Sequence, residues 1–69
     1  MGETIMSGEY KFLMRFVGTD VSERNLLRYH SKSEIEENVR DGYIVAVRFH
    51  EDGEPVYGIT ERGKHKRDD

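Results

Sequence analysis

The sequence predicts a small α+β domain in which a four-stranded antiparallel sheet carries one short helix on one face, in the order ββαββ. Three observations lead to this fold. A chain of 69 residues has room for one domain only. Residues 10–17 and 43–50 alternate apolar and polar side chains with a period of two, which is typical of strands with one buried face. Between these segments, a capping serine followed by glutamates marks the start of a helix.

The predicted domain occupies residues 9–61, between a small polar segment at 1–8 that we expect to be flexible and a charged tail at 62–69. There is no cysteine, so neither disulfides nor thiolate ligands can stabilise the fold. No apolar run is long enough to cross a membrane, and the N-terminus lacks a signal-peptide pattern. We therefore expect a soluble, cytoplasmic protein with no membrane partner.

The first strand is predicted at residues 10–17, and a break follows at 18–20. One side of this strand presents the inward residues Tyr10, Phe12, Met14 and Phe16. The other side presents Lys11, Leu13, Arg15 and Val17. A helix is the alternative structure here, because some of these apolar positions also fit a helical stripe.

Residues 24–30 fit two local structures. As a strand, they place Arg28 and His30 on the outer face. As a helix, they are capped by Asp20, with Glu23 completing a capping box, but the apolar residues are poorly spaced for a period of 3.6. We favour the strand.

A short helix is predicted at residues 34–41. Ser33 is a suitable N-cap, and the glutamates that follow lie in the first turn, where the helix dipole favours negative charge. Ile35 and Val39 share one face, which would cover the sheet. Gly42 is placed where a C-terminal glycine ends a helix.

A β-hairpin is predicted from strands at 43–50 and 56–60. A two-residue loop would set Phe49 opposite Val56. A three-residue loop that ends in a left-handed Gly53 gathers the large apolar side chains on one face, whereas a slip of one residue would turn them over. We prefer the three-residue loop, which pairs Val47 with Tyr57 and Val45 with Ile59.

The two faces of the predicted sheet differ in character. The helix covers the face that holds the predicted core: Tyr10, Phe12, Met14, Phe16, Leu27, Tyr29, Tyr43, Val45, Val47, Phe49, Tyr57 and Ile59, closed by Ile35 and Val39. The opposite face mixes aliphatic and basic residues. Its predicted partner-binding set is Lys11, Leu13, Arg15, Arg28, Ile44, Arg48 and His50. The alternative is an ordinary half-exposed sheet, which needs no partner.

The charge distribution indicates what kind of partner this face would bind. The net charge is −3, whereas a dedicated nucleic-acid binder is usually basic. The aromatic residues that would stack on single strands alternate inward, and carboxylates on the predicted helix would repel phosphates. We therefore expect a protein partner or self-association as a homodimer, with nucleic acid as the second choice.

Residues 39–64 contain two runs and a turn: Val39-Arg40-Asp41-Gly42-Tyr43-Ile44, Glu51-Asp52-Gly53 and Tyr57-Gly58-Ile59-Thr60-Glu61-Arg62-Gly63-Lys64. This stretch resembles the end of the recognition helix and the wing of winged-helix regulators, whose wing strands often run "GYI…DG…Y.ITERGK". The resemblance implies a winged-helix fold and a DNA-binding transcriptional regulator. The DNA-backbone contacts would then come from the basic residues near the C-terminus: Arg62, Lys64, Lys66 and Arg67.

No catalytic or ligand site is recognisable in the sequence. The histidines at 30, 50 and 65 lack metal-ligand spacing. There is no thiol nucleophile, and Gly63-Lys64 lacks the preceding glycine and the context of a P-loop. We predict no enzymatic activity, no metal, no cofactor and no small-molecule substrate.

The leading prediction is a non-enzymatic binding module of the regulator or inhibitor type that docks on a macromolecular partner. Its layout is similar to that of small phage-encoded inhibitors, which is an analogy at the level of fold. The alternative is a winged-helix DNA-binding transcriptional regulator. A domain made mainly of strands would favour the first function, whereas three helices of normal length would favour the second.

Overall fold

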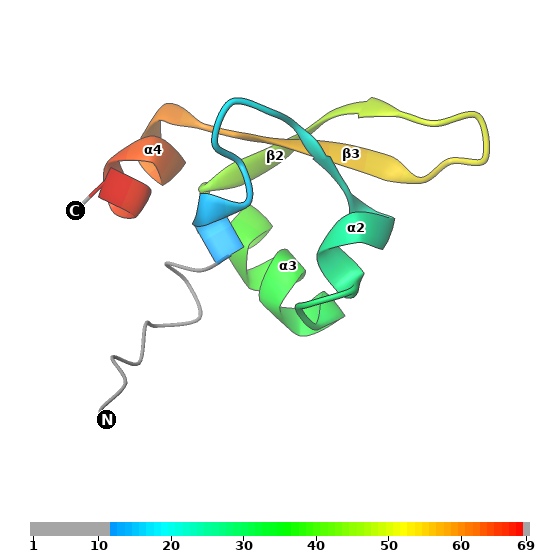
Figure 1. Cartoon of the computed structure of the whole chain (residues 1–69), viewed down its shortest axis with the longest axis horizontal. Coiled ribbons are helices and arrows are strands. Elements are labelled where there is room, and N and C mark those ends of the chain that lie inside the picture. Colours follow the sequence, from blue (N-terminus) through cyan, green and yellow to red (C-terminus); the bar gives the residue numbers. More distant parts are fainter. Residues whose placement is uncertain (1–11, 69) are drawn as a thin grey trace.

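The computed structural model describes residues 12–68, which form an α+β domain with a three-stranded antiparallel sheet (Figure 1). Along the chain, the elements are helical residues 12–14, β1 (Val21–Ser22), α2 (Glu23–Leu27), α3 (Lys32–Arg40), β2 (Ile44–Phe49), β3 (Pro55–Ile59) and α4 (Glu61–Asp68). The strand order is β1-β3-β2, so β3 is central. Helices α2 and α3 lie on one side of the sheet, and α4 lies beyond its end (Figure 1).

The predicted ββαββ order with four strands is wrong, because the first predicted strand is helical where the structure describes it. Residues 12–14 are in a helix that ends in turns, and the Phe16 N–H donates to the Leu13 carbonyl oxygen at 3.1 Å. Phe12, Leu13 and Phe16 are all buried, whereas Met14 is 43% exposed. This is the i, i+1, i+4 spacing of a helical face. The predicted flexible segment at 1–8, together with Tyr10 and Lys11, lies outside the described residues.

The second predicted strand is also wrong, since residues 24–30 contain most of α2 and a turn. Ser22 is the N-cap of α2, and its hydroxyl oxygen accepts from the Asn25 N–H at 3.3 Å. Leu26 is fully buried, whereas Tyr29, which the strand would have turned inward, is 63% exposed. The alternative of a helix was correct in kind, although Ser22 rather than Asp20 caps it.

The predicted central helix is confirmed as α3, with its start moved towards the N-terminus. Ser31 is the N-cap, and its hydroxyl accepts from the Glu34 N–H at 3.1 Å, so Ser33 is an exposed helical residue. Ile35 is buried, but Val39 is only partly covered. The helix ends as predicted, because Gly42 follows the C-cap with a φ of +81°, which glycine adopts without strain.

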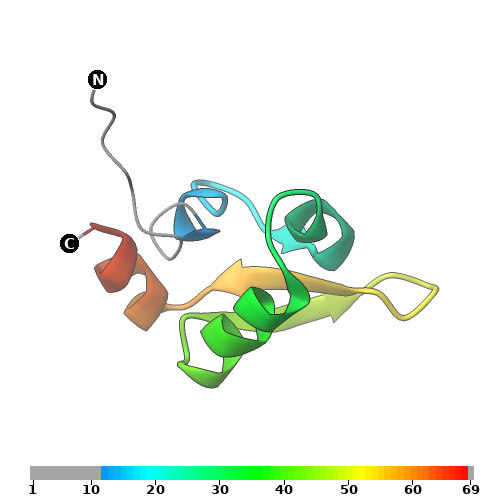
Figure 2. The ribbon, with the colours of Figure 1, turned by 90° about the horizontal axis from the view of Figure 1, so that it is seen from below.

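The hairpin of β2 and β3 projects past α2 and α3 (Figure 2), and its turn has the predicted form. Gly53 has a φ of +90°, and its N–H donates to the His50 carbonyl oxygen at 2.9 Å. Next to the turn the register is the preferred one, with Arg48 opposite Val56. A β-bulge between Ala46 and Arg48 then shifts the remaining pairs to Ala46 with Tyr57, Val45 with Gly58 and Ile44 with Ile59. The predicted pairs of Val47 with Tyr57 and Val45 with Ile59 are therefore wrong.

Burial along β2 differs from the prediction, because Ile44 is buried and residues 45–49 are all exposed. An extra residue on one strand turns over the side chains on the far side of the bulge from the turn. Ile44, predicted on the outer face, is therefore buried, whereas Val45 and Val47, predicted in the core, are 49% and 48% exposed. Phe49 lies near the tip of the hairpin and is 64% exposed.

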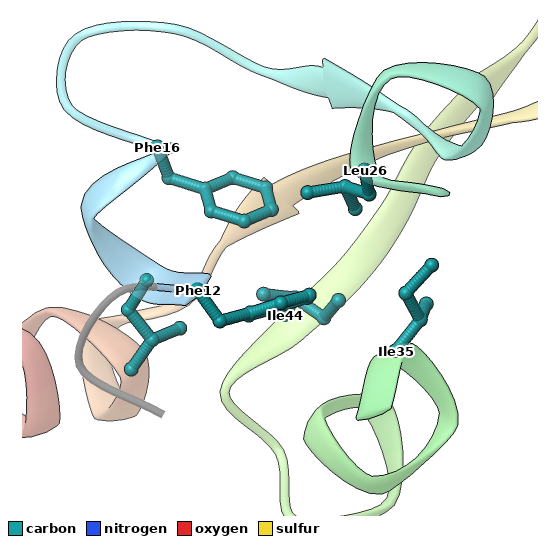
Figure 3. Packing of buried hydrophobic residues seen from close by; sticks show 6 residues of the cluster. Phe12, Phe16, Leu26, Ile35 and Ile44 are labelled. Carbon is teal, nitrogen blue, oxygen red and sulfur yellow. The ribbon is translucent and has the colours of Figure 1, made fainter. Parts of the chain in front are cut away.

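The core lies between the helices and the start of β2 (Figure 3). Its buried cluster consists of Phe12, Leu13, Phe16, Leu26, Ile35 and Ile44, and Val21, Tyr43, Tyr57 and Ile59 pack against it. The predictions for Phe12, Phe16 and Ile35 are confirmed. Most of the cluster comes from helices, which explains why an assignment based on strand faces misplaced the rest.

Two phenylalanines test this core. Phe12→Ala should lower the free energy of unfolding by roughly 3–5 kcal/mol, because it opens a cavity in the cluster. Phe49→Ala should change it by less than about 0.5 kcal/mol, because the ring is largely in solvent. Chemical denaturation followed by circular dichroism measures both values, and Phe12→Leu provides a milder variant if Phe12→Ala does not fold. Equal losses for Phe12→Ala and Phe49→Ala would contradict this core.

Candidate functional site

The partner-binding face predicted from the sequence does not form a single surface among the described residues. Leu13 and Ile44 are buried, so their predicted exposure is wrong. The remaining exposed members lie on separate elements: Arg15 in the turn after helical residues 12–14, Arg28 after α2, Arg48 in β2 and His50 in the hairpin loop. Lys11 is outside the described residues. Since two of the four predicted strands are helical, there is no sheet face on which these side chains could gather.

Two of these arginines are engaged within the domain. The Arg48 guanidinium lies 3.0 Å from a carboxylate oxygen of Asp20. The Arg15 guanidinium lies 4.2 Å from the centre of the Tyr29 ring, and its Nε–H donates to the His30 ring at 3.3 Å. Arg28 makes no side-chain hydrogen bond or ion pair with any residue of 12–68. Of the predicted arginines, it is therefore the one most available to a partner.

His30 links three parts of the helical layer. Its Nε2 accepts from Arg15, and its Nδ1 lies 3.0 Å from Glu34 Oε1 on α3. Its ring also meets Phe12 edge-on, with 5.1 Å between the ring centres. Because a guanidinium only donates, the proton of the neutral ring belongs on Nδ1, where it donates to Glu34. His30 therefore has a structural role, and it holds the turn before α3 in place.

The motif that resembles a wing forms a clasp between α4 and the start of β2, made by Thr60, Arg62 and Gly63. The Thr60 hydroxyl donates to the Gly42 carbonyl oxygen at 2.6 Å and accepts from the Gly63 N–H at 3.0 Å. The Arg62 Nε–H donates to the Asp41 carbonyl oxygen at 2.8 Å, next to the end of α3. Arg62 thus satisfies a backbone acceptor after α3, which differs from the DNA-backbone contact that the resemblance implies.

Gly63 makes the closest approach in this clasp. A Cβ at this position would lie well under 3.0 Å from the Tyr43 carbonyl oxygen and 2.7 Å from Ile59 Cγ1. Backbone cannot move aside as a flexible side chain can. Any residue larger than glycine would therefore push α4 away from the chain that leads into β2.

The other basic residues of the predicted tail lie on α4. Lys64 is 3.6 Å from Glu61, and Arg67 is 3.1 Å from Asp68. Lys66 Nζ lies 6.0 Å from the centre of the Tyr43 ring. Beside this helix runs a groove of about 540 Å³ whose charged lining residues are Asp20, Lys64 and Arg67. Each of these has an oppositely charged partner, so the groove offers no unpaired charge to a ligand.

The hairpin tip is acidic and is held against α2. Arg24 lies 3.3 Å from Asp52 and 3.5 Å from Glu54, and its backbone N–H donates to Glu54. A hydrogen bond from the Glu54 N–H, followed by the charge of Arg24, lowers the pKa of Asp52. The hairpin and the start of α2 are thus connected by charge as well as by the sheet.

The solvent-facing side of α3 is the most distinctive exposed surface. Ser33, Glu36, Glu37 and Arg40 are exposed at i, i+3, i+4 and i+7, opposite the buried Ile35 and Asn38. None of the three charged side chains has a hydrogen bond or ion pair within residues 12–68. Burial, then the charge of Glu23 and then that of Glu36 raise the pKa of Tyr57. Sequence reasoning did not single out this face, although its spacing is visible once the helix starts at Lys32.

Comparisons with family models, curated proteins and solved structures find no match. The part of the chain that the structure describes contains no helix that is long and apolar enough to cross a membrane. In the same residues, no three side chains of His, Asp or Glu are grouped so that they could hold a metal ion.

The clasp is tested by Gly63→Ala. In an ordinary exposed helix, replacing glycine by alanine stabilises by about 1 kcal/mol. Here the added Cβ should instead destabilise the domain by about 1–3 kcal/mol, because it overpacks against backbone. Thermal and urea unfolding measure the sign of the change, with Lys64→Ala as a control on the exposed side of the same helix. A more stable Gly63→Ala protein would rule out the close approach.

Proposed function

We propose that this chain is a winged-helix domain that binds duplex DNA. The observation that carries the proposal is the order of the elements. A helix is followed by β1, then by α2 and α3, then by the β2–β3 hairpin, and β1 pairs with β3 at the edge opposite β2. This arrangement is the one expected of a winged-helix domain, with the hairpin as the wing. The helical residues 12–14 and α2 replace the two strands on which the leading prediction depended.

The pair formed by α2 and α3 supports the assignment of α3 as the recognition helix. Residues 28–31 connect the two helices, which fits the short turn of a helix-turn-helix. In such a pair the second helix enters the major groove and presents residues near its N-terminus to the bases. The exposed side of α3 meets this requirement, because it is not covered by another element of the described chain.

Basic side chains lie at both ends of α3. Arg28 and Lys32 are exposed at its start, and Arg40 is exposed at its end. Lys32 has only a loose contact of 3.9 Å with Glu23. Phosphate contacts from such flanking residues would fix the position of a helix on the duplex without reading sequence.

The carboxylates in this region determine what kind of DNA binding is possible. Glu36, Glu37 and the acidic hairpin tip repel phosphates, and phosphate neutralisation supplies essentially all of non-specific binding. We therefore propose a binder with low affinity for random DNA, whose selectivity depends on contacts with base edges. The Lys64, Lys66 and Arg67 side chains of α4 remain candidates for additional backbone contacts.

Docking on a protein is the second candidate function, and the apolar side chains of β2 favour it. Val45, Val47 and Phe49 are each about half exposed or more, and together with the carboxylates of α3 they would suit a partner protein or a second copy of the chain. This function would be supported if the chain bound no duplex from a random library but associated with a protein through β2.

The DNA proposal is tested by selecting bound duplexes from a random library and measuring affinity by fluorescence anisotropy at several salt concentrations. The double variant Arg28→Glu/Arg40→Glu should weaken binding at least tenfold, and the slope of log K against log salt should fall by about 0.9 for each phosphate that is no longer neutralised. The charge-matched comparison is Lys64→Glu/Lys66→Glu on α4, which should change binding much less. If the α4 variant lost as much affinity as the Arg28→Glu/Arg40→Glu variant, the main contact with DNA would have to include α4.

A further inference from the structure

We propose that Glu37 is a specificity-determining residue that selects cytosine. This inference rests on the proposed DNA-binding function and goes beyond it, because it names the base that the exposed side of α3 reads. The starting observation is the position of this carboxylate. Glu37 lies in the middle of α3, between the exposed Ser33 and Arg40, and it has no hydrogen-bond or ion-pair partner for its side chain within residues 12–68.

The neighbouring Arg40 does not occupy the Glu37 carboxylate. It lies three residues after Glu37, at a spacing where opposite charges on a helix commonly pair. Yet the two side chains form no ion pair, and Arg40 also has no partner in the described chain. Both charged groups are therefore available to a ligand that approaches this side of α3.

The chemistry of the major groove restricts what a carboxylate can contact there. An ionised carboxylate only accepts hydrogen bonds. Guanine presents two acceptors in this groove, and thymine presents one acceptor and a methyl group. Adenine places an acceptor beside its amino group, whereas cytosine presents the amino group alone. Cytosine is thus the one base whose exposed edge donates to Glu37 without also repelling it.

Arg40 fixes the position of this contact. As a flanking basic residue at the end of α3, it would bind a phosphate and hold the helix in the groove while Glu37 meets the base edge. Since Glu37 also repels phosphates, it lowers the affinity for all DNA, and a contact with cytosine offsets that loss at the preferred site.

Glu36 provides a matched control from the same helix. It carries the same carboxylate one residue earlier, but its charge acts on Tyr57 of the sheet. Both Glu36→Gln and Glu37→Gln replace an exposed carboxylate by an amide of the same shape and remove one negative charge. A general effect of charge on DNA affinity should therefore be the same in both variants, whereas an effect on base choice should follow Glu37 alone.

The experiment selects duplexes from a random library with the wild-type chain, Glu37→Gln and Glu36→Gln, and then measures binding to the best wild-type site and to versions with one cytosine replaced. Wild type should prefer cytosine at one position by roughly 5- to 150-fold over the other bases. Glu37→Gln should lose that preference at that position and bind random DNA more tightly, while Glu36→Gln should keep it.

The outcomes separate the two proposals. If Glu37→Gln binds DNA and keeps the wild-type base preferences, Glu37 does not determine specificity, although the DNA-binding function stands. If Glu36→Gln loses the same preference equally, the effect is one of general charge and the inference fails. If none of the three proteins binds any duplex, the proposed function fails and the inference fails with it. Circular dichroism of each variant confirms that the helices are retained.

Discussion

The close packing of Gly63 against the Tyr43 carbonyl is the constraint on which the geometry of this domain depends. Tyr43 stands between the end of α3 and the start of β2, so a helix that packs there fixes the angle between these two elements. Thr60 and Arg62 donate to the backbone carbonyls of Gly42 and Asp41, the two residues before that point. Within the buried cluster, Ile44 is the strand residue that joins the helices to the sheet.

Much of the fold could be predicted where the signal is local. The helix at α3, its end at Gly42 and the left-handed Gly53 of the hairpin follow from capping and turn chemistry over a few residues. Residues 12–16 were misread because Phe12 and Phe16 satisfy a period of two and a helical spacing of four equally well. The bulge at Val47 could not be foreseen, since it results from contacts between strands rather than from the sequence of β2 alone.

The candidate site was harder to predict than the fold because it depends on contacts between distant residues. The basic face required four strands, and it disappears once two of them are helical. The motif around Arg62 resembles a wing, yet Thr60, Arg62 and Gly63 all serve the clasp. The motif therefore indicates how the backbone folds at this junction. The candidate binding residues of this chain lie instead on the exposed side of α3.

The bulge in β2 also limits how another molecule can approach the hairpin. β2 is an edge strand, because it pairs with β3 on one side only, and edge strands are the usual places where a foreign chain extends a sheet. A bulge interrupts the regular row of donors and acceptors and twists the strand away. Extension of the sheet by an incoming strand is therefore disfavoured despite the exposed valines, and the domain gains protection from edge-to-edge aggregation.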